Sequence, residues 1–402
     1  MGENNKNERL RVRSNLCSSI KCEIRSTAEN ELDMLLVGLL ALVPYVHFVI
    51  SAVMILTISL SLMVMRRTRL RILEQRKLII ITALIVFVSS VGSLLSGNVI
   101  GLAVTLGVLL ILICAAYVRS VMTRAILNRV FKTVALGSLV TIVIVLIQRF
   151  SDSNPGYRPT GWQWNANYLG SVAVISALIS MIAFFENYGC DGRNKRTFYK
   201  ALYAAAFFAN IAIILICESR SSLLAIMAVV VVYMLLRKHY ILGIAAVLLG
   251  VSVWVLGMFY PAMFGWANSL TYVFTQRYDI WMCAFKSFLQ GPIEFLIGRG
   301  PMTYWFVWET EGLYRADHAH NIVFDTLINV GVIGGVLYIF LMSDFAANML
   351  RKKSEGDRAA FALSALALTA IFVQGIADVT IMWHQTACLF ILACGASSVK
   401  KE

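Results

Sequence analysis

Long apolar runs alternate with short basic clusters along the chain. Residues 78–117, 221–236 and 240–260 contain no charged side chain. Runs of about 20 apolar residues are typical of membrane-spanning helices, whereas the alternating ten-residue segments of membrane barrels are only weakly represented. The pattern therefore predicts an all-α polytopic membrane protein.

Seven basic clusters separate the apolar runs and indicate how many spans to expect. They hold 28 of the 35 Lys and Arg residues, and they lie in residues 1–33, 66–77, 119–132, 193–200, 237–238, 351–358 and 400–401. Because cytoplasmic segments retain Lys and Arg, an even number of spans is expected between neighbouring clusters. Most intervals then hold two spans each.

The first interval, residues 34–65, needs a separate argument. It contains no Asp, Glu, Lys or Arg, and as one helix it would rise about 48 Å, more than a hydrocarbon core of about 30 Å. We therefore expect two short helices that turn near Pro44–His47. The total becomes about 12 transmembrane helices with both termini cytoplasmic.

This count predicts five parts of the chain. They are a polar cytoplasmic tail (1–33), spans one to nine (34–260), a loop domain on the outer face (261–321), spans ten to twelve (322–398) and a short cytoplasmic tail (399–402). A connection of about 60 residues is too long to be structureless. The loop carries Trp266, Trp281, Trp305 and Trp308, so we expect it to fold, with a helix over 267–289.

Composition narrows the possible partners. The chain is 59% hydrophobic and carries a net charge of +13. Since the basic residues fall in predicted cytoplasmic segments, the charge does not indicate a nucleic-acid partner. Of the eight cysteines, only Cys217 and Cys283 are expected on an oxidising side, and nothing in their spacing favours a disulfide.

Seven basic residues remain on the predicted outer face, and three of them stand out. Arg220 lies between two apolar runs beside Glu218 and three serines, where it either snorkels to lipid headgroups or forms part of a polar site. Arg277 begins a helical stretch, where a surface ion pair is the alternative. Arg158 precedes a loop that contains Trp164 and Asn167; stacking aromatics and amides suit sugars, although Trp also anchors proteins at membrane interfaces.

Two of the five histidines, His318 and His320, stand just before an apolar helix. They could cap that helix, or bind a metal with Asp317 or Asp325, although such a pair is weak support for zinc. We favour a general base, because histidine titrates near neutral pH. Arginines beside it would bind a diphosphate bidentately and stabilise its developing charge without Mg²⁺.

Four patches, in this order, resemble the O-antigen ligase family, which includes related polysaccharide polymerases. They are residues 158–169, residues 219–225, residues 276–281 with 298–301, and residues 318–321 with 330–335. The resemblance extends in layout from about residue 36 to 395 and implies about a dozen membrane helices with a loop domain between late spans. Glu218, where a small or polar residue is expected, and the long N-terminal tail depart from the family.

The resemblance also implies an activity and a set of site residues. Such enzymes transfer a glycan from an undecaprenyl-diphosphate carrier to an acceptor hydroxyl on the outer face of the cytoplasmic membrane, without a metal or other cofactor. The acceptor is lipid A-core in a ligase and another carrier-linked glycan in a polymerase, and this choice stays open. The implied catalytic residues are His320, Arg220 and Arg277; the implied substrate-binding residues are Arg158, His318, Asn321, Asn167 and Trp164.

Two other kinds of function remain as alternatives. A transporter or flippase of a lipid-linked glycan would call for inverted repeats and charges deep in the spans, and no convincing repeat is present. A non-catalytic assembly scaffold would tolerate replacement of the outer polar residues. Membrane lipids are expected partners in each case, and the sequence does not indicate an oligomeric state.

Overall fold

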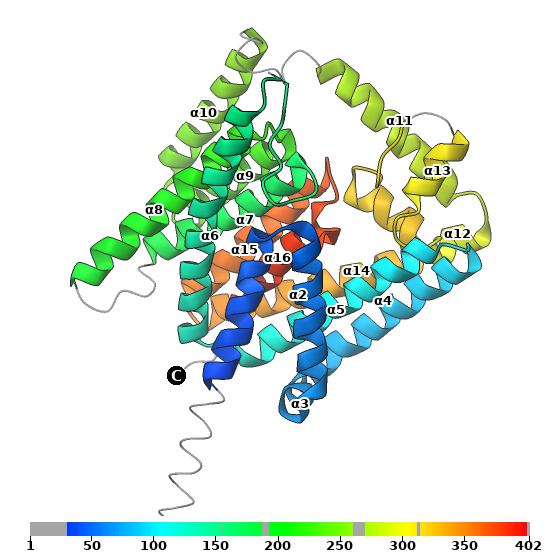
Figure 1. Ribbon diagram of the computed structural model, residues 1–402, viewed down its shortest axis with the longest axis horizontal. Helices are drawn as coiled ribbons and strands as arrows, with labels where there is room; N and C mark the ends of the chain where they lie inside the picture. The colour runs from blue at the N-terminus through cyan, green and yellow to red at the C-terminus, as the bar shows by residue number, and fades with distance from the viewer. Residues whose placement is uncertain (1–29, 155, 187–192, 260–269, 312–313, 400–402) are drawn as a thin grey trace, which may run out of the picture.

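The computed structural model describes residues 30–154, 156–186, 193–259, 270–311 and 314–399. The described residues form helices and no strands (Figure 1). After a helical segment over residues 30–42, the elements are η1 (Val43–Tyr45), α2 (Phe48–Val64), α3 (Arg66–Glu74), α4 (Arg76–Leu95), α5 (Val99–Val121), α6 (Arg124–Ser151), α7 (Ala166–Phe185), α8 (Arg193–Ile216), α9 (Arg220–Leu236), α10 (Tyr240–Phe259), α11 (Leu270–Phe288), α12 (Pro292–Ile297), α13 (Tyr304–Glu311), α14 (Ile322–Ser354), α15 (Arg358–Gly375), η3 (Thr380–Met382), α16 (His384–Gly395) and η4 (Ala396–Ser398).

Seven of the described helices are long and apolar enough to cross a membrane, or eight if the bent pair α2 and α3 counts as one span. The chain is therefore an integral membrane protein, but the predicted count of about 12 is not confirmed. Several other apolar helical segments are each 17 residues or shorter: residues 30–42, α2, α9, Tyr240–Ser252 of α10, and α16. Short apolar segments such as η3 (Thr380–Met382) make the hydrophobic runs of the sequence longer than the α-helices within them.

The expected break in the first apolar stretch is present. The chain leaves the first helix through η1 and starts α2 at Phe48, with His47 as its N-cap. At the other end of α2 the chain bends by 93° into α3, which lies at the opposite end of the bundle from α11 (Figure 1). Most of the predicted cytoplasmic tail, residues 1–29, lies outside the described residues, as do Trp266 and residues 400–402.

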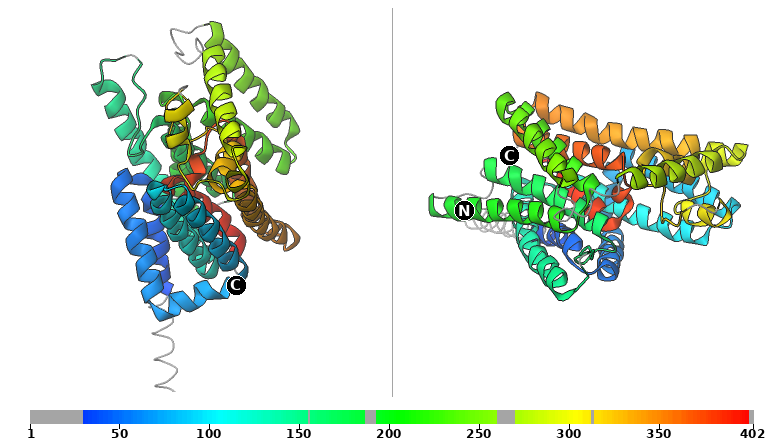
Figure 2. Two further views of the ribbon diagram at one scale, coloured as in Figure 1. Left: turned by 90° about the vertical axis from the view of Figure 1, so that its right-hand side faces the viewer. Right: turned by 90° about the horizontal axis from the view of Figure 1, so that it is seen from above.

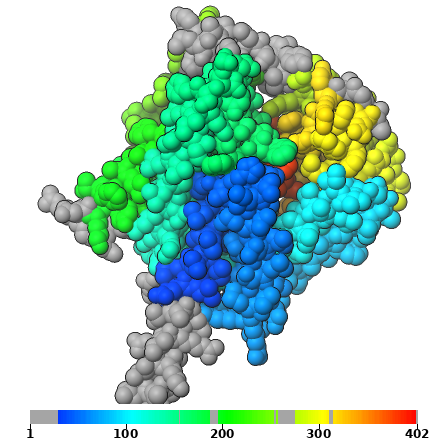
Figure 3. Space-filling model, in the orientation of Figure 1, coloured from blue at the N-terminus to red at the C-terminus, as the bar shows by residue number. Residues whose placement is uncertain are grey.

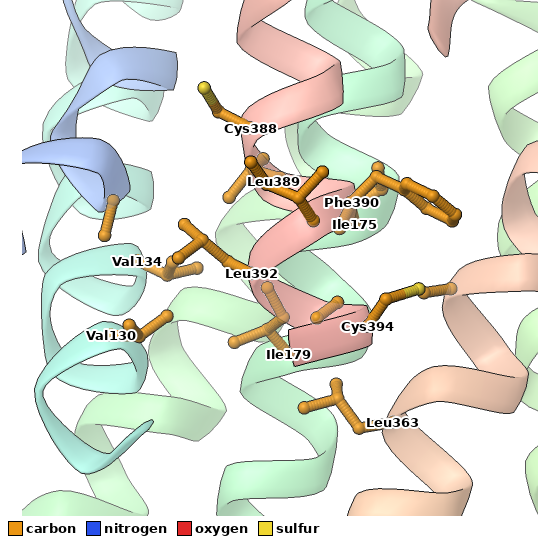
Figure 4. Close-up of a cluster of buried hydrophobic side chains, with 14 of the residues drawn as sticks. Val130, Val134, Ile175, Ile179, Leu363, Cys388, Leu389, Phe390, Leu392 and Cys394 are labelled. Carbon is orange, nitrogen blue, oxygen red and sulfur yellow. The ribbon is translucent and has the colours of Figure 1, made fainter. Parts of the chain in front are cut away.

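Helix α7 is the centre of the bundle. Every residue of α7 from Tyr168 to Ala183 is buried. The helix packs against α6, α8, α9, α15 and α16. Small residues such as Gly170, Ala173 and Ser176 allow neighbouring helices to approach closely. Aliphatic side chains of α6, α7, α15 and α16 fill the space between these helices (Figure 4).

The described residues between α10 and α14, 270–311 and 314–321, form a small module with its own apolar core. Residues of α11 and α13, including Ile280, Phe288 and Tyr304, pack with Ala319 and Ile328 at the start of α14. The module lies beside the end of α4 and the first part of α14 (Figure 2), and Asn98, in the turn between α4 and α5, donates to Arg299 O and Pro301 O. The location of this module on the outer face of the membrane stays a prediction.

A close backbone approach joins this module to α14. Helix α14 is broken at Gly331, whose φ is +61°, and a Cβ at this glycine would lie 2.4 Å from Ile297 N. A Cβ at Gly298 would lie 2.5 Å from the backbone of Asn329. Only glycine fits such positive-φ positions against a neighbouring backbone, which accounts for two of the glycine patches in the sequence.

Candidate active site

A buried carboxylate, Asp378, is the centre of a polar cluster at the turn between α15 and η3. His318 donates from Nε2 to Asp378 Oδ1 over 2.6 Å, and His320 Nδ1 lies 3.4 Å from the same oxygen. The second carboxylate oxygen accepts a 2.8 Å hydrogen bond from Asn167 Nδ2 at the start of α7. Asp378 therefore joins three segments: its own turn, the loop with the two histidines, and the start of α7.

The loop that carries the histidines is held in place where it enters α14. Asn321 caps α14 by accepting from Val323 N and Phe324 N, and its Nδ2 donates to Ile376 O beside Asp378. His320 has a φ of +49°, a left-handed conformation that is uncommon for a non-glycine residue. Such strain persists only where the surroundings enforce it, and it is found preferentially at functional sites.

The histidine–aspartate pair is electrostatically coupled. Burial by itself lowers the pKa of His318, but the bond to Asp378 and the charges of Asp378, Asp325 and Asp317 outweigh burial and raise it above its usual value. Burial likewise works to raise the pKa of Asp378, yet the bonds and charges of the two histidines bring it well below its usual range. Asp378 is therefore ionised, and it favours the imidazolium form of His318.

Arg158 ties the start of α7 to the turn before α9. Its Nε donates to Cys217 O over 2.9 Å, and its NH2 group donates to Glu218 O and to Asn167 Oδ1. Glu218 has a φ of +51°, so this turn holds a second strained residue. The guanidinium of Arg158 thus fixes the backbone that leads into Arg220 and orients the amide that binds Asp378.

A buried polar network supports Arg220, the first residue of α9. Gln374, one turn before Asp378 on α15, donates to Ser171 Oγ of α7 over 2.6 Å and to Ser222 Oγ of α9 over 2.8 Å. Ser219 and Ser222 are 2.7 Å apart. The starts of α7 and α9 and the end of α15 are therefore cross-linked directly beneath the site.

The sequence-predicted arginines lie in the same electrostatic environment. Arg220 interacts through its charge with Arg158 and Arg277. Burial lowers the pKa of Arg277, and the nearby charge of Asp378 opposes that effect. Trp281, one turn beyond Arg277 on α11, donates from Nε1 to His320 O over 3.4 Å. Arg277 therefore lies within reach of the charge of Asp378, and Arg220 lies within reach of the charges of Arg158 and Arg277, although these residues come from separate parts of the chain.

Two further predicted residues lie differently. The side chain of Asn321 is used by the helix cap and by Ile376 O, which makes it part of the scaffold of the site. Trp164 is 62% exposed and packs against Phe48 at a ring-centroid distance of 5.5 Å. In the space-filling view a hollow opens between the segment before α7, the start of α2 and the module, with atoms of the last part of the chain on its floor (Figure 3).

The sequence analysis did not predict Asp378 as a residue of the site. The sequence did carry a signal, since Asp378 is the one acidic residue between Arg358 and Glu402. A lone carboxylate between two apolar runs is expensive to bury and therefore indicates a function. Its partners could not be read from the sequence, because they lie on segments far away along the chain.

An apolar groove starts beside the site and follows α14. It has a volume of about 570 Å³ and is lined by residues of α5, α14, α15, η3 and α16. Ile322, Val323 and Ile381 line the end next to Asn321 and Asp378, and Ala346 lines the other end. The groove is therefore suited to a long apolar chain whose polar end reaches the cluster.

The cluster also has the composition of a metal site. One ligand atom each from His318, His320 and Asp378 lies within 4.8 Å of the others, and two histidines with a carboxylate are a common set of ligands for transition metals. The positive charges of Arg220 and Arg277 beside it disfavour a divalent cation. Cys217 and Cys283 form no disulfide in the described part of the chain.

One family model matches the chain. Residues 205–339 match the model described as O-antigen ligase, and this segment contains Arg220, Arg277, His318 and His320. It leaves out Arg158, Asn167 and Asp378. No curated protein matches the chain.

Proposed function

We propose that this chain, which belongs to the O-antigen ligase family through residues 205–339, is a membrane glycosyltransferase that uses a prenyl-diphosphate-linked glycan. The donor would be an undecaprenyl-diphosphate-linked glycan, and the acceptor a sugar hydroxyl of lipid A-core or of another carrier-linked glycan. The reaction would take place at the outer face of the cytoplasmic membrane, with both termini in the cytoplasm. No metal or other cofactor takes part.

In the proposed reaction the acceptor oxygen attacks the anomeric carbon of the donor sugar. As the new carbon–oxygen bond forms, the bond from that carbon to the diphosphate breaks, and its electron pair leaves with the diphosphate. The acceptor proton passes to a histidine nitrogen. Arg220 and Arg277 bind the leaving diphosphate, whose growing negative charge they stabilise in a site of low polarity.

His320 is the better placed of the two histidines for the role of base. Its Nδ1 faces Asp378, which leaves Nε2 as the basic nitrogen, and 24% of its side chain is exposed against 9% for His318. His318 is buried, and among the described residues no hydrogen-bond partner lies near its Nδ1. In this proposal the His318–Asp378 pair positions and polarises His320.

The observation that carries the proposal is the combination at one point of three groups. They are the arginines Arg220 and Arg277, of which Arg277 interacts with the charge of Asp378, a histidine beside Asp378, and the end of the apolar groove. The first group suits a diphosphate, the second a hydroxyl proton, and the third a prenyl chain. A flippase that only moves the donor forms no glycosidic bond and needs no base for an acceptor hydroxyl.

Reconstitution tests the proposal directly. Purified protein in liposomes, supplied with a prenyl-diphosphate-linked glycan and an acceptor glycan, should form the glycosidic product and release prenyl diphosphate in equal amounts, with or without a chelator. Movement of the donor across the bilayer without product would support the flippase instead. Supplying lipid A-core and carrier-linked acceptors in separate reactions distinguishes a ligase from a polymerase.

A further inference from the structure

A row of aromatic rings leads from the surface to the buried histidine. Trp164 and Phe48 have ring centroids 5.5 Å apart, Phe48 and Trp383 5.7 Å, and Trp383 and Tyr168 4.6 Å. Tyr168 in turn lies 6.3 Å from the ring of His318. These four residues, the aromatic row, begin with an exposed tryptophan and end with a tyrosine that is 2% exposed.

The exposed end of the row is held rigidly. Gln148 exchanges two hydrogen bonds with the backbone of Gly161, and Gln163 donates to Pro44 O over 2.7 Å. Phe48 N donates to Trp162 O over 3.0 Å. Asn165, directly after Trp164, caps α7 by accepting from Asn167 N and Tyr168 N. Because the backbone is fixed on both sides of Trp164, the exposed indole is pre-organised, which lowers the entropy cost of binding a ligand.

The row and the apolar groove approach the histidines by separate routes. The row is built from the start of α2, the start of α7 and Trp383, and it shares no residue with the lining of the groove. An interfacial tryptophan that anchors the protein in lipid needs no continuous path to a buried imidazole. The path therefore indicates a ligand that reaches the base from the water side.

We infer that the aromatic row is the binding site for the acceptor glycan. The apolar C–H face of a pyranose ring packs on an exposed indole, which buries apolar surface of both partners. A glycan seated on Trp164 and Phe48 extends toward Trp383 and Tyr168, and its hydroxyl arrives at the His318–His320 pair. The inference rests on the proposed function, and it assigns the groove to the donor and the row to the acceptor.

Trp164→Ala tests the row through its effect on each substrate separately. We expect the acceptor KM to rise about 10-fold, equivalent to about 1.4 kcal/mol, with kcat at saturating acceptor and the donor KM changed less than twofold. Trp164→Phe should restore most of the acceptor affinity, because it keeps a ring. Phe150→Ala, at an 83% exposed aromatic at the end of α6, is the matched control and should leave both KM values unchanged.

The possible results separate the two proposals. If wild-type protein forms no glycosidic product, the proposed function fails; if it does and Trp164→Ala leaves the acceptor KM unchanged, the row is only an interfacial anchor. A rise in the donor KM alone would also overturn the inference. Should Trp164→Ala accumulate poorly, the Kd of the acceptor is measured in the His320→Ala protein alone and combined with Trp164→Phe or with Trp164→His. We expect the Trp164→His combination to bind the acceptor more weakly than the Trp164→Phe combination. An equal Kd in all three proteins contradicts the inference.

Discussion

His318 donates a 2.6 Å hydrogen bond to Asp378, although 60 positions separate the two residues in the chain. The bond joins the loop before α14 to the turn after α15, and the same carboxylate also binds Asn167 of α7. The histidines are therefore positioned by contacts with α7 and the α15 turn as well as by the start of α14. A disturbance of the α15 turn is expected to reach them directly.

The His318–Asp378 pair makes stability depend on pH. A raised histidine pKa contributes stability that is fully present below its ordinary value of about 6.5 and is lost as the pH rises through the folded-state value. The lowered Asp378 pKa contributes stability that is present above about 3.9 and is lost as the pH falls through the folded-state value. We expect the Tm of the solubilised protein to fall on the alkaline side, and His318→Gln to remove that part of the fall.

The control for this pH effect is His239→Gln. His239 is exposed and follows the C-terminal end of α9, whereas Arg220 begins this helix. It should keep the wild-type dependence of Tm on pH. An alkaline fall of the same size in His318→Gln and wild type would show that the pair does not carry the effect.

The helical class and the gathering of the arginines and histidines follow from the sequence. Apolar runs identify the helices, and charges at their ends are rare enough to mark Arg220, His318 and His320 as candidates. The role of Asp378 does not follow from the sequence, because it depends on contacts with residues that are distant along the chain. The span count of about 12 is not confirmed, because apolar turns and apolar helix residues look alike in a hydropathy pattern.

Replacing either diphosphate-binding arginine by lysine tests the need for a planar, bidentate donor. Lysine keeps the charge but loses the guanidinium fork. We expect Arg220→Lys and Arg277→Lys each to lower kcat/KM for the donor about 10²-fold, or about 2.7 kcal/mol, measured by product formation at limiting donor. Arg149→Lys, at the end of α6, should behave as wild type. Full activity in both lysine variants would remove the diphosphate role.

The break in α14 gives a prediction about stability. At Gly331 an added Cβ would lie 2.4 Å from backbone atoms of Leu296 and Ile297, and the φ of +61° is strained for alanine. Gly331→Ala should therefore destabilise the protein by about 2 kcal/mol or more, seen as a lower Tm. Gly335→Ala, four residues on, meets its nearest atoms at 3.9 Å and should leave Tm unchanged or raise it. An equal Tm in the two variants would contradict the close approach.

Metal removal tests whether the histidine–aspartate cluster works as a base or as a metal site. Because Arg220 and Arg277 repel a cation there, we expect exhaustive treatment with EDTA to leave the rate of glycan transfer unchanged. Metal analysis of the purified protein should find no stoichiometric transition metal. Activity that disappears with EDTA and returns with Zn²⁺ would replace the histidine base by a metal-bound species.

The central claim is that His320 takes the proton while the arginines bind the diphosphate, and one comparison tests it most directly. Donor Kd and the single-turnover rate of transfer are measured in wild type, His320→Ala and His239→Ala. The account predicts that His320→Ala binds the donor with an unchanged Kd, transfers the glycan at least about 10²-fold more slowly, and accumulates normally, while His239→Ala matches wild type. A His320→Ala protein that transfers at the wild-type rate would contradict the account.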